Sequence, residues 1–431
     1  MFSNRTPWSP SSWQSMSQRQ LPHYQDDAAL QQVLARIQSY PRLVAISEIR
    51  RLTSRMARVA HGRGFILQGG DCAESFSDFC PKIIRQHYHL LQQMAAMIGA
   101  ASHQPVVRIG RIAGQYAKPR SSAMECVAGQ ELPSYRGDMI NGAEFQEQAR
   151  QTDPLRMETA YFKAAGSLNY LRSLNSEANA SRAGSYFTSH EALLLPYEQS
   201  MLEQDAMGNW YCGSGHFLWI GERTRALDGA HVEFLRGVCN PIGVKLGPTV
   251  SREELIRLID VLNPFNEAGR LTLIVRNGAA HIDRLPKLLE AIQLEGREVL
   301  WMCDPMHGNG IQTADGIKTR DFASIQAELN GFLDAHRKIG THPGGVHLEL
   351  TGLNVSECLG GPSKVSEADL ATGYLSACDP RLNPEQAMAL TATLVNQLGL
   401  ASERATSPIA PKAQVGLPAV HAQHLDWESR V

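Results

Sequence analysis

The side chains best suited to bind a metal ion in this 431-residue chain are a thiol, an imidazole and two carboxylates at or just beyond short apolar runs: Cys72, His307, Glu349 and Asp379. Together they form a mixed soft and hard donor set that suits a divalent transition metal such as Mn²⁺, Co²⁺, Fe²⁺ or Zn²⁺. Taken singly, each is more typical of an ordinary structural residue: a packed thiol, a hydrogen-bonded histidine or a solvated acid. Their shared placement favours the metal site.

Four cations lie inside or directly after equally apolar runs: Arg111, Arg223, Lys245 and Arg276. Lys and Arg are seldom buried unless they are paired. One alternative is a set of structural salt bridges with acids such as Glu191 and Glu222. The spacing favours instead a pocket for a small, multiply charged anion, because arginine forks and a lysine point charge bind carboxylate and phosphate oxygens.

A third cluster, KPRS, contains Lys118, Arg120 and Ser121. By itself it is typical of a basic surface turn. Beside the four cations it predicts a second anion subsite. Two anion subsites with a metal between them indicate the condensation of two phosphorylated or carboxylated small molecules. The metal would polarise a carbonyl and the cations would stabilise developing negative charge.

Eight apolar runs would position these side chains, and each is typical of a buried parallel strand. They cover residues 65–72, 105–111, 185–191, 217–223, 242–247, 272–276, 299–307 and 346–350. Between them the apolar period becomes helical, as in 83–98, 252–262 and 322–339. Helices between eight strands, with chemistry at the C-terminal strand ends, predict an α/β fold of the (β/α)8 TIM barrel type.

The chain divides into a catalytic barrel over 61–399, an N-terminal extension over 1–60 and a C-terminal tail over 400–431. The extension consists of a polar arm and two helices between Ala28 and Ala60. Asn383 and Pro384 are expected to open the last helix as its cap and first position. The tail loses periodicity and is either a flexible end or an arm that docks on a neighbour. The stretch 112–184 is too long for a simple crossover and is expected to be functional.

The bulk composition is that of an ordinary globular protein, with 43% hydrophobic residues, 19% charged residues and a formal net charge of −2. This balance creates no global field for nucleic acid or an anionic membrane, and no apolar stretch is long enough to span a bilayer. Eight scattered cysteines without a CxxC pair, and no N-terminal signal, predict reduced thiols. We therefore expect a cytoplasmic enzyme that binds neither nucleic acid nor membrane.

Several longer motifs resemble those of the type II 3-deoxy-D-arabino-heptulosonate 7-phosphate (DAHP) synthases. They lie between about residues 45 and 399, and the most specific are LQGGDCAE (67–74), RIAGQYAKPRS (111–121), SYRGDMING (134–142), SHEALLL (189–195), WIGERTR (219–225), GVKLGP (243–248), CDPMHGN (303–309), GIKTR (316–320) and ACDPRLN (377–383). Enzymes of this family condense phosphoenolpyruvate with erythrose 4-phosphate at the entry to the shikimate pathway.

The resemblance implies a role for each candidate residue. A divalent metal, Mn²⁺ or Co²⁺ before Zn²⁺ or Fe²⁺, would be held by the four donors already named. Phosphoenolpyruvate would be gripped by the four cations, with Glu222 beside them, and erythrose 4-phosphate would lie toward Lys118, Arg120 and Ser121. Lys245, Arg111 and Glu191 would act in the reaction itself, Glu191 by orienting or deprotonating a water. Asp304 would support the metal from behind, and a homo-oligomer, dimer or tetramer, is expected.

One departure from the family pattern concerns regulation. Fuller members carry a helical insertion, where an aromatic amino acid effector binds, between the SYRGDMING region and the SHEA strand. Here that region has room for one helix and a short turn. The compact form is similar to those of phenazine-type secondary-metabolite pathways, without feedback by aromatic amino acids. Alternatives are a housekeeping enzyme of the same activity, another metal-dependent aldolase on the same barrel, or a non-catalytic relative.

Overall fold

The structure, a computed structural model, describes residues 7–127, 129–179 and 185–406. The start of the N-terminal arm, the turn after the predicted single helix, and residues 407–431 of the predicted tail lie outside the described residues. Within the described part, none of the helices combines the length and the apolar run that crossing a bilayer requires.

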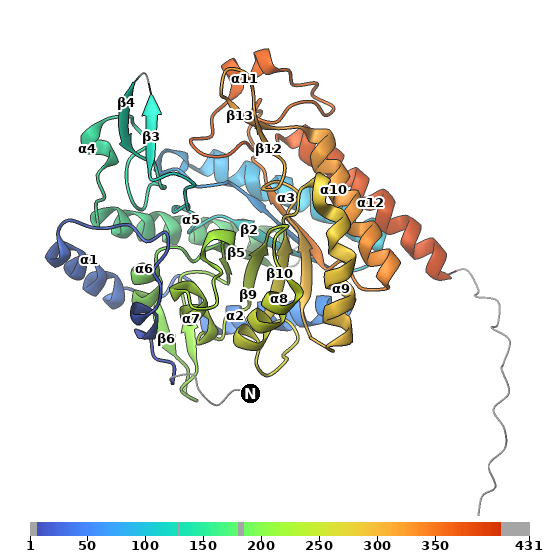
Figure 1. Cartoon of the computed structure of the whole chain (residues 1–431), viewed down its shortest axis with the longest axis horizontal. Coiled ribbons are helices and arrows are strands. Elements are labelled where there is room, and N and C mark those ends of the chain that lie inside the picture. The colour runs from blue at the N-terminus through green and yellow to red at the C-terminus, as the bar shows by residue number, and fades with distance from the viewer. Residues whose placement is uncertain (1–6, 128, 180–184, 407–431) are drawn as a thin grey trace, which may run out of the picture.

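Eight parallel strands close into a barrel, which confirms the predicted (β/α)8 fold (Figure 1). Each predicted apolar run overlaps one of these strands, and six of the eight contain the whole strand. In barrel order they are β1 (Phe65–Gly70), β14 (Gly345–Glu349), β11 (Leu300–Cys303), β10 (Leu271–Val275), β9 (Ile242–Leu246), β8 (Phe217–Ile220), β5 (Tyr186–Glu191) and β2 (Val106–Arg111).

Helices surround the barrel, and three small hairpins extend from it (Figure 1). The helices are α1 (Asp27–Ser39), α2 (Ile46–Ala60), α3 (Pro81–Ser102), α4 (Glu147–Arg150), α5 (Leu155–Asn179), α6 (Leu195–Ser200), α7 (Ala230–Arg236), α8 (Arg252–Leu262), α9 (Leu285–Leu294), α10 (Phe322–Ile339), α11 (Glu367–Gly373) and α12 (Pro384–Thr406). The hairpins are β3–β4 (Met124–Val127, Gln130–Pro133), β6–β7 (Leu202–Gln204, Trp210–Cys212) and β12–β13 (Gly310–Gln312, Lys318–Arg320).

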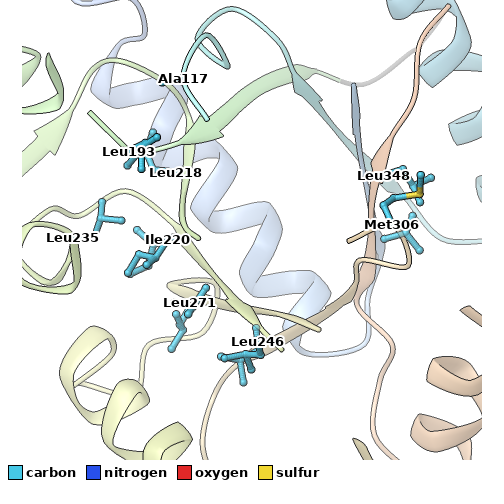
Figure 2. Packing of buried hydrophobic residues seen from close by; sticks show 14 of the residues in the cluster. Ala117, Leu193, Leu218, Ile220, Leu235, Leu246, Leu271, Met306 and Leu348 are labelled. Carbon is cyan, nitrogen blue, oxygen red and sulfur yellow. The ribbon is translucent and has the colours of Figure 1, made fainter. Parts of the chain in front are cut away.

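Alternation along the strands separates two apolar cores. On β8, Leu218 and Ile220 face the outer layer between barrel and helices, where Figure 2 shows them with Leu246 of β9. Phe217 and Trp219, the alternate residues, belong to the second cluster, inside the barrel. Because side chains of a strand point to opposite faces in turn, the parity of a strand residue decides whether it faces the barrel interior.

The helix α2 closes the barrel interior at the N-terminal ends of the strands. Leu52, Met56 and Val59 recur at helical spacing and pack into the interior cluster with Ile66 and Leu300. The prediction of two helices before the first strand is confirmed by α1 and α2. Because the far end is filled by side chains, the opposite end, at the C-terminal ends of the strands, is left open for chemistry.

The predicted start of the last helix is also confirmed. Pro384 is the first residue of α12, and the Oδ1 atom of Asn383 accepts a hydrogen bond of 2.9 Å from the backbone N–H of Gln386. The long stretch after β2 contains the β3–β4 hairpin, the short α4 and α5. The single helix expected in the shortened region is therefore α5.

Candidate active site

Strand register brings two predicted site residues together at the C-terminal end of the barrel. Gly70, at the end of β1, pairs with Glu349 of β14 on one side and with Arg111 of β2 on the other. A Cβ atom at Gly70 would lie 2.6 Å from the carbonyl oxygen of Arg111. Across Gly70, Arg111 Nη2 lies 3.0 Å from Glu349 Oε1.

A cavity of about 430 Å³ opens at this end of the barrel. Eleven of the predicted site residues line it: Cys72, Arg111, Lys118, Glu191, Glu222, Arg223, Lys245, Arg276, His307, Glu349 and Asp379. Arg120 and Ser121 do not line it. Four of these residues reach the cavity because they occupy strand positions whose side chains face the barrel interior. They are Arg111, Glu191, Lys245 and Glu349.

The four predicted metal donors converge on one side of the cavity. Donor atoms of Cys72, Glu349 and Asp379 all lie within 4.8 Å of one another. His307 Nε2 lies 2.9 Å from Glu349 Oε1, so the imidazole faces the same point. The ammonium of Lys118 contacts both Cys72 Sγ and Asp379 Oδ2, which shows that this donor set accommodates a positive charge. The soft thiol and the hard carboxylates together fit a divalent transition metal.

Electrostatics favour the ionised form of the acids in this set. Burial alone would raise the pKa of Glu349, but the charges of His307, Arg320, Lys118 and Arg111 hold that pKa well below its ordinary value. Burial likewise opposes ionisation of Asp379, yet Lys118 lowers the pKa of Asp379 below its ordinary value. Carboxylates that stay ionised are the form that binds a metal cation.

Asp304 supports His307 from behind. Its Oδ2 atom lies 2.7 Å from His307 Nδ1 and 3.0 Å from the ammonium of Lys245. A carboxylate on the far nitrogen fixes the orientation of the ring, so that Nε2 is directed toward Glu349. Asp304 therefore links the donor set to the cations.

The four cations differ in how many hydrogen bonds and ion pairs they already make within the protein. The Arg111 guanidinium is 2% exposed and is held by Glu349 and His347, and Lys245 is held by Asp304. Arg276 donates from Nη2 to the carbonyl oxygen of His307 at 2.6 Å. Arg223 is exposed at the cavity and makes no hydrogen bond or ion pair within the described part of the chain. Arg223 and Arg276 are thus the cations most available to a bound anion.

Glu191 has the geometry of a proton acceptor. Its Oε1 atom is buried without a hydrogen-bond partner among the described residues. Burial raises the pKa of Glu191 above its ordinary value, and Lys245 opposes that rise. An unpartnered carboxylate with a raised pKa at a cavity wall is suited to take a proton from water. Glu222, in contrast, is tied to Arg225 at 2.9 Å and to the backbone N–H of Gly247 at 2.6 Å.

Gly221 provides the space that the Glu191 carboxylate occupies. A Cβ atom at position 221 would lie 2.1 Å from Glu191 Oε1. We expect Gly221→Ala to displace that carboxylate and to lower kcat by about 10²-fold, the lower range for loss of a general base. Steady-state kinetics measure this effect, with Gly99→Ala in α3, where a Cβ meets only contacts of 3.5 Å or more, as the control. Unchanged kcat in Gly221→Ala would contradict the expected displacement of the Glu191 carboxylate from its working position.

The KPRS loop is divided by the fold. Lys118 points into the cavity, whereas the Arg120 guanidinium pairs with Glu125, and Ser121 is exposed to solvent. The backbone of Arg120 is held by the N-terminal arm, where Gln20 accepts from its N–H at 3.0 Å and donates to its carbonyl at 3.1 Å. The predicted second anion subsite therefore has one of its three side chains in the cavity.

Sequence reasoning from strand ends missed several cavity residues. Arg320 is fully buried, and its Nη2 atom lies 2.7 Å from Glu349 Oε2. Lys318 also lines the cavity, as does Gln115, whose Oε1 accepts from the backbone N–H of Glu191 at 2.8 Å. Lys318 and Arg320 come from the β12–β13 hairpin and not from a barrel strand. The signal that could have identified them is the GIKTR motif, which contains both.

The sequence model of the Class-II DAHP synthetase family matches residues 8–184 and 174–395. The chain belongs to this family. Similar proteins include the phospho-2-dehydro-3-deoxyheptonate aldolase of Streptomyces coelicolor, 43% identical across 89% of this chain and 96% of that protein. Its namesake from Mycolicibacterium smegmatis is 42% identical across 88% of this chain and 92% of that protein. The family resemblance and the assignment as an enzyme of this class are confirmed.

A solved structure shows the same fold as this DAHP synthetase family member. It is a phospho-2-dehydro-3-deoxyheptonate aldolase from Francisella tularensis SCHU S4, with a TM-score of 0.52 over 85% of this chain and 96% of that chain. At 15% sequence identity the likeness concerns the fold alone.

Proposed function

We propose that the chain condenses phosphoenolpyruvate with D-erythrose 4-phosphate and water to give DAHP and inorganic phosphate, the first step of the shikimate pathway. One observation carries the proposal: in a member of the DAHP synthetase family, the residues predicted to hold a metal and those predicted to bind anions line a single cavity at the C-terminal end of the barrel. This is the end at which barrel enzymes perform chemistry. The relatives named as phospho-2-dehydro-3-deoxyheptonate aldolases support the same activity.

The carboxylate and phosphate of phosphoenolpyruvate would bind to Arg223, Arg276 and Lys245, with Arg111 fixing Glu349 beside them. Arginine forks suit both groups, and the buried Lys245 ammonium supplies charge in a site of low dielectric constant. The aldehyde end of erythrose 4-phosphate would then lie toward the donor set, and its phosphate toward Lys118 and the loop that carries Arg120 and Ser121.

A divalent metal, Mn²⁺ or Co²⁺ first, would be held by Cys72, His307, Glu349 and Asp379 and would supply a Lewis acid. The chain's own residues supply the remaining steps. Lys245 and Arg276 would hold phosphoenolpyruvate so that its C3 attacks the aldehyde carbon. The aldehyde oxygen would gain a proton to become a hydroxyl, and Glu191 would take a proton from the water that adds at C2. Phosphate then leaves C2 by cleavage of the C–O bond.

We further propose that this synthase serves a dedicated pathway of the phenazine type, without feedback by aromatic amino acids. The family match supports a shortened region, because its two segments overlap over residues 174–184, a stretch that begins inside α5 and ends before β5. We expect consumption of phosphoenolpyruvate, followed by its absorbance, to be unchanged by Phe, Trp or Tyr, alone or combined. Inhibition by any of them would assign the chain instead to housekeeping aromatic amino acid synthesis.

A further inference from the structure

Glu328 is a buried carboxylate that the proposed chemistry does not use. It lies on the face of α10 that packs onto the barrel, among Ile325, Leu329 and Phe332, and it has no exposed surface. Its Oε1 atom accepts from the backbone N–H of Gly278 at 2.8 Å, and its Oε2 atom accepts from the side-chain amide of Asn309 at 2.7 Å. One carboxylate outside the barrel thus contacts the loops that follow β10 and β11.

Asn309 extends this connection into both loops. Its Oδ1 atom accepts from the backbone N–H of Ala279 at 2.9 Å, in the loop after β10. Its Nδ2 group also donates to the carbonyl oxygen of Pro305 at 2.8 Å, in the loop after β11. These bonds fix which end of the amide faces Glu328, because turning the amide over would break both of them.

The two loops approach each other so closely that both contact positions are glycines. A Cβ atom at Gly278 would lie 2.6 Å from the carbonyl oxygen of Gly308, and one at Gly308 would lie 2.2 Å from the backbone nitrogen of Gly278. Gly278 has a φ of +77°, which glycine adopts without strain. Glu328 and Asn309 therefore stabilise a direct backbone contact between Gly278 and Gly308.

Each of these two loops, after β10 and after β11, carries one residue of the candidate active site. Arg276 lies two residues before Gly278, and His307 lies two residues before Asn309. Arg276 also donates to the carbonyl oxygen of His307. A shift of one loop against the other would change the separation between the cation expected to hold phosphoenolpyruvate and a ligand expected to hold the metal.

The two donors that face Glu328 require a side chain with two acceptor oxygens, which is a carboxylate. Burial disfavours the ionised form of that carboxylate. Both oxygens must accept, from the Gly278 N–H and the Asn309 amide, so a glutamine would place donor against donor. Burial raises the pKa of Glu328 to about 8 and the nearby Asp304 adds to the rise, while the hydrogen bonds from the Gly278 N–H and the Asn309 amide lower that pKa and favour the carboxylate. A hydrophobic residue at this position would leave the Gly278 N–H and the Asn309 amide buried without an acceptor, so the acid is what joins the two loops.

We propose that Glu328 is a positioning residue, which acts through Asn309 and Gly278 to set the distance between Arg276 and His307. The inference rests on the proposed function of those two residues. The polar residues behind metal ligands commonly change metal affinity or activity by about 10- to 100-fold when they are replaced.

The test compares Glu328→Gln, Asn309→Ser and the double variant with wild type, and Asp334→Asn, an exposed acid on the same helix, serves as the charge control. For Glu328→Gln we expect kcat/KM for phosphoenolpyruvate to fall by about 10- to 100-fold, while Tm shifts by only a few degrees. The kcat/KM of the double variant should be no lower than that of the more impaired single variant, because both residues act through one connection. Asp334→Asn should match wild type.

A second readout does not depend on turnover. Titration of each protein with Co²⁺, followed by visible absorption, measures the donor set directly, and we expect the apparent Kd to rise by about 10-fold in Glu328→Gln. Wild-type kinetics and Co²⁺ binding by Glu328→Gln, or losses that multiply in the double variant, would overturn the inference. If Glu328→Gln does not fold, Asn309→Ser alone decides by the same two readouts. A wild type that does not consume phosphoenolpyruvate would contradict the proposed function, while the Co²⁺ titration would still test Glu328.

Discussion

Replacement of Lys245 by methionine is expected to lower kcat/KM by about 10³-fold while the protein stays folded. The Lys245 side chain is buried, and its Nζ atom lies 3.0 Å from Asp304 and 3.2 Å from His307 Nδ1. Burial lowers the pKa of Lys245 below its ordinary value, and Asp304 opposes that shift. Methionine keeps the volume of the side chain but removes the charge that faces the bound anion.

The fold is expected to tolerate this change because Asp304 keeps its bonds to His307. The exposed Lys287→Met in α9 is the matched control and should retain normal kinetics. Steady-state kinetics and thermal unfolding of both variants separate loss of the cation from loss of structure. Near-normal kcat/KM in Lys245→Met would remove this lysine from the substrate site.

The largest effect on stability is expected for Glu349→Gln. Glu349 has no exposed surface and lies 3.0 Å from Arg111, 2.7 Å from Arg320 and 2.9 Å from His307. Removal of its charge leaves two buried guanidinium groups without their shared anion, which costs about 3–5 kcal/mol of the free energy of unfolding. The same change removes a metal donor, so activity should be lost as well.

Urea denaturation measures the first effect, and metal content after dialysis measures the second, with the exposed Glu367→Gln as control. The pH dependence gives a further check. Because the pKa of Glu349 is held well below its ordinary value of 4.5, its contribution to stability is full above that value and is lost as the pH falls below it. Glu349→Gln should therefore lose less stability on acidification than wild type. Equal stability of the two proteins at neutral pH would contradict the account of this cluster.

The barrel and much of its cavity could be predicted because continuous apolar runs and the helical periodicity between them are local signals. Each apolar run marks a strand, and Arg111, Lys245 and Glu349 stand at or near the C-terminal ends of three of these strands. The family motifs then assign chemistry to these positions.

Positions outside the strands could not be predicted in this way. Nothing in KPRS states that Lys118 turns inward while Arg120 pairs with Glu125, since Gln20 of the distant arm helps to hold that loop. Arg320 reaches Glu349 from a hairpin, and α2 fills one end of the barrel with residues that sequence identifies only as the apolar face of a helix. These features depend on contacts between distant segments, which periodicity does not encode.

The proposed reaction can be tested most directly by measuring phosphoenolpyruvate and inorganic phosphate together after erythrose 4-phosphate is added in Mn²⁺, and again in chelator. The account predicts one phosphate released for each phosphoenolpyruvate consumed, with both processes dependent on erythrose 4-phosphate and abolished by the chelator. Condensation without phosphate release would indicate a different aldolase on this barrel, and no consumption with any divalent metal would contradict the proposed function.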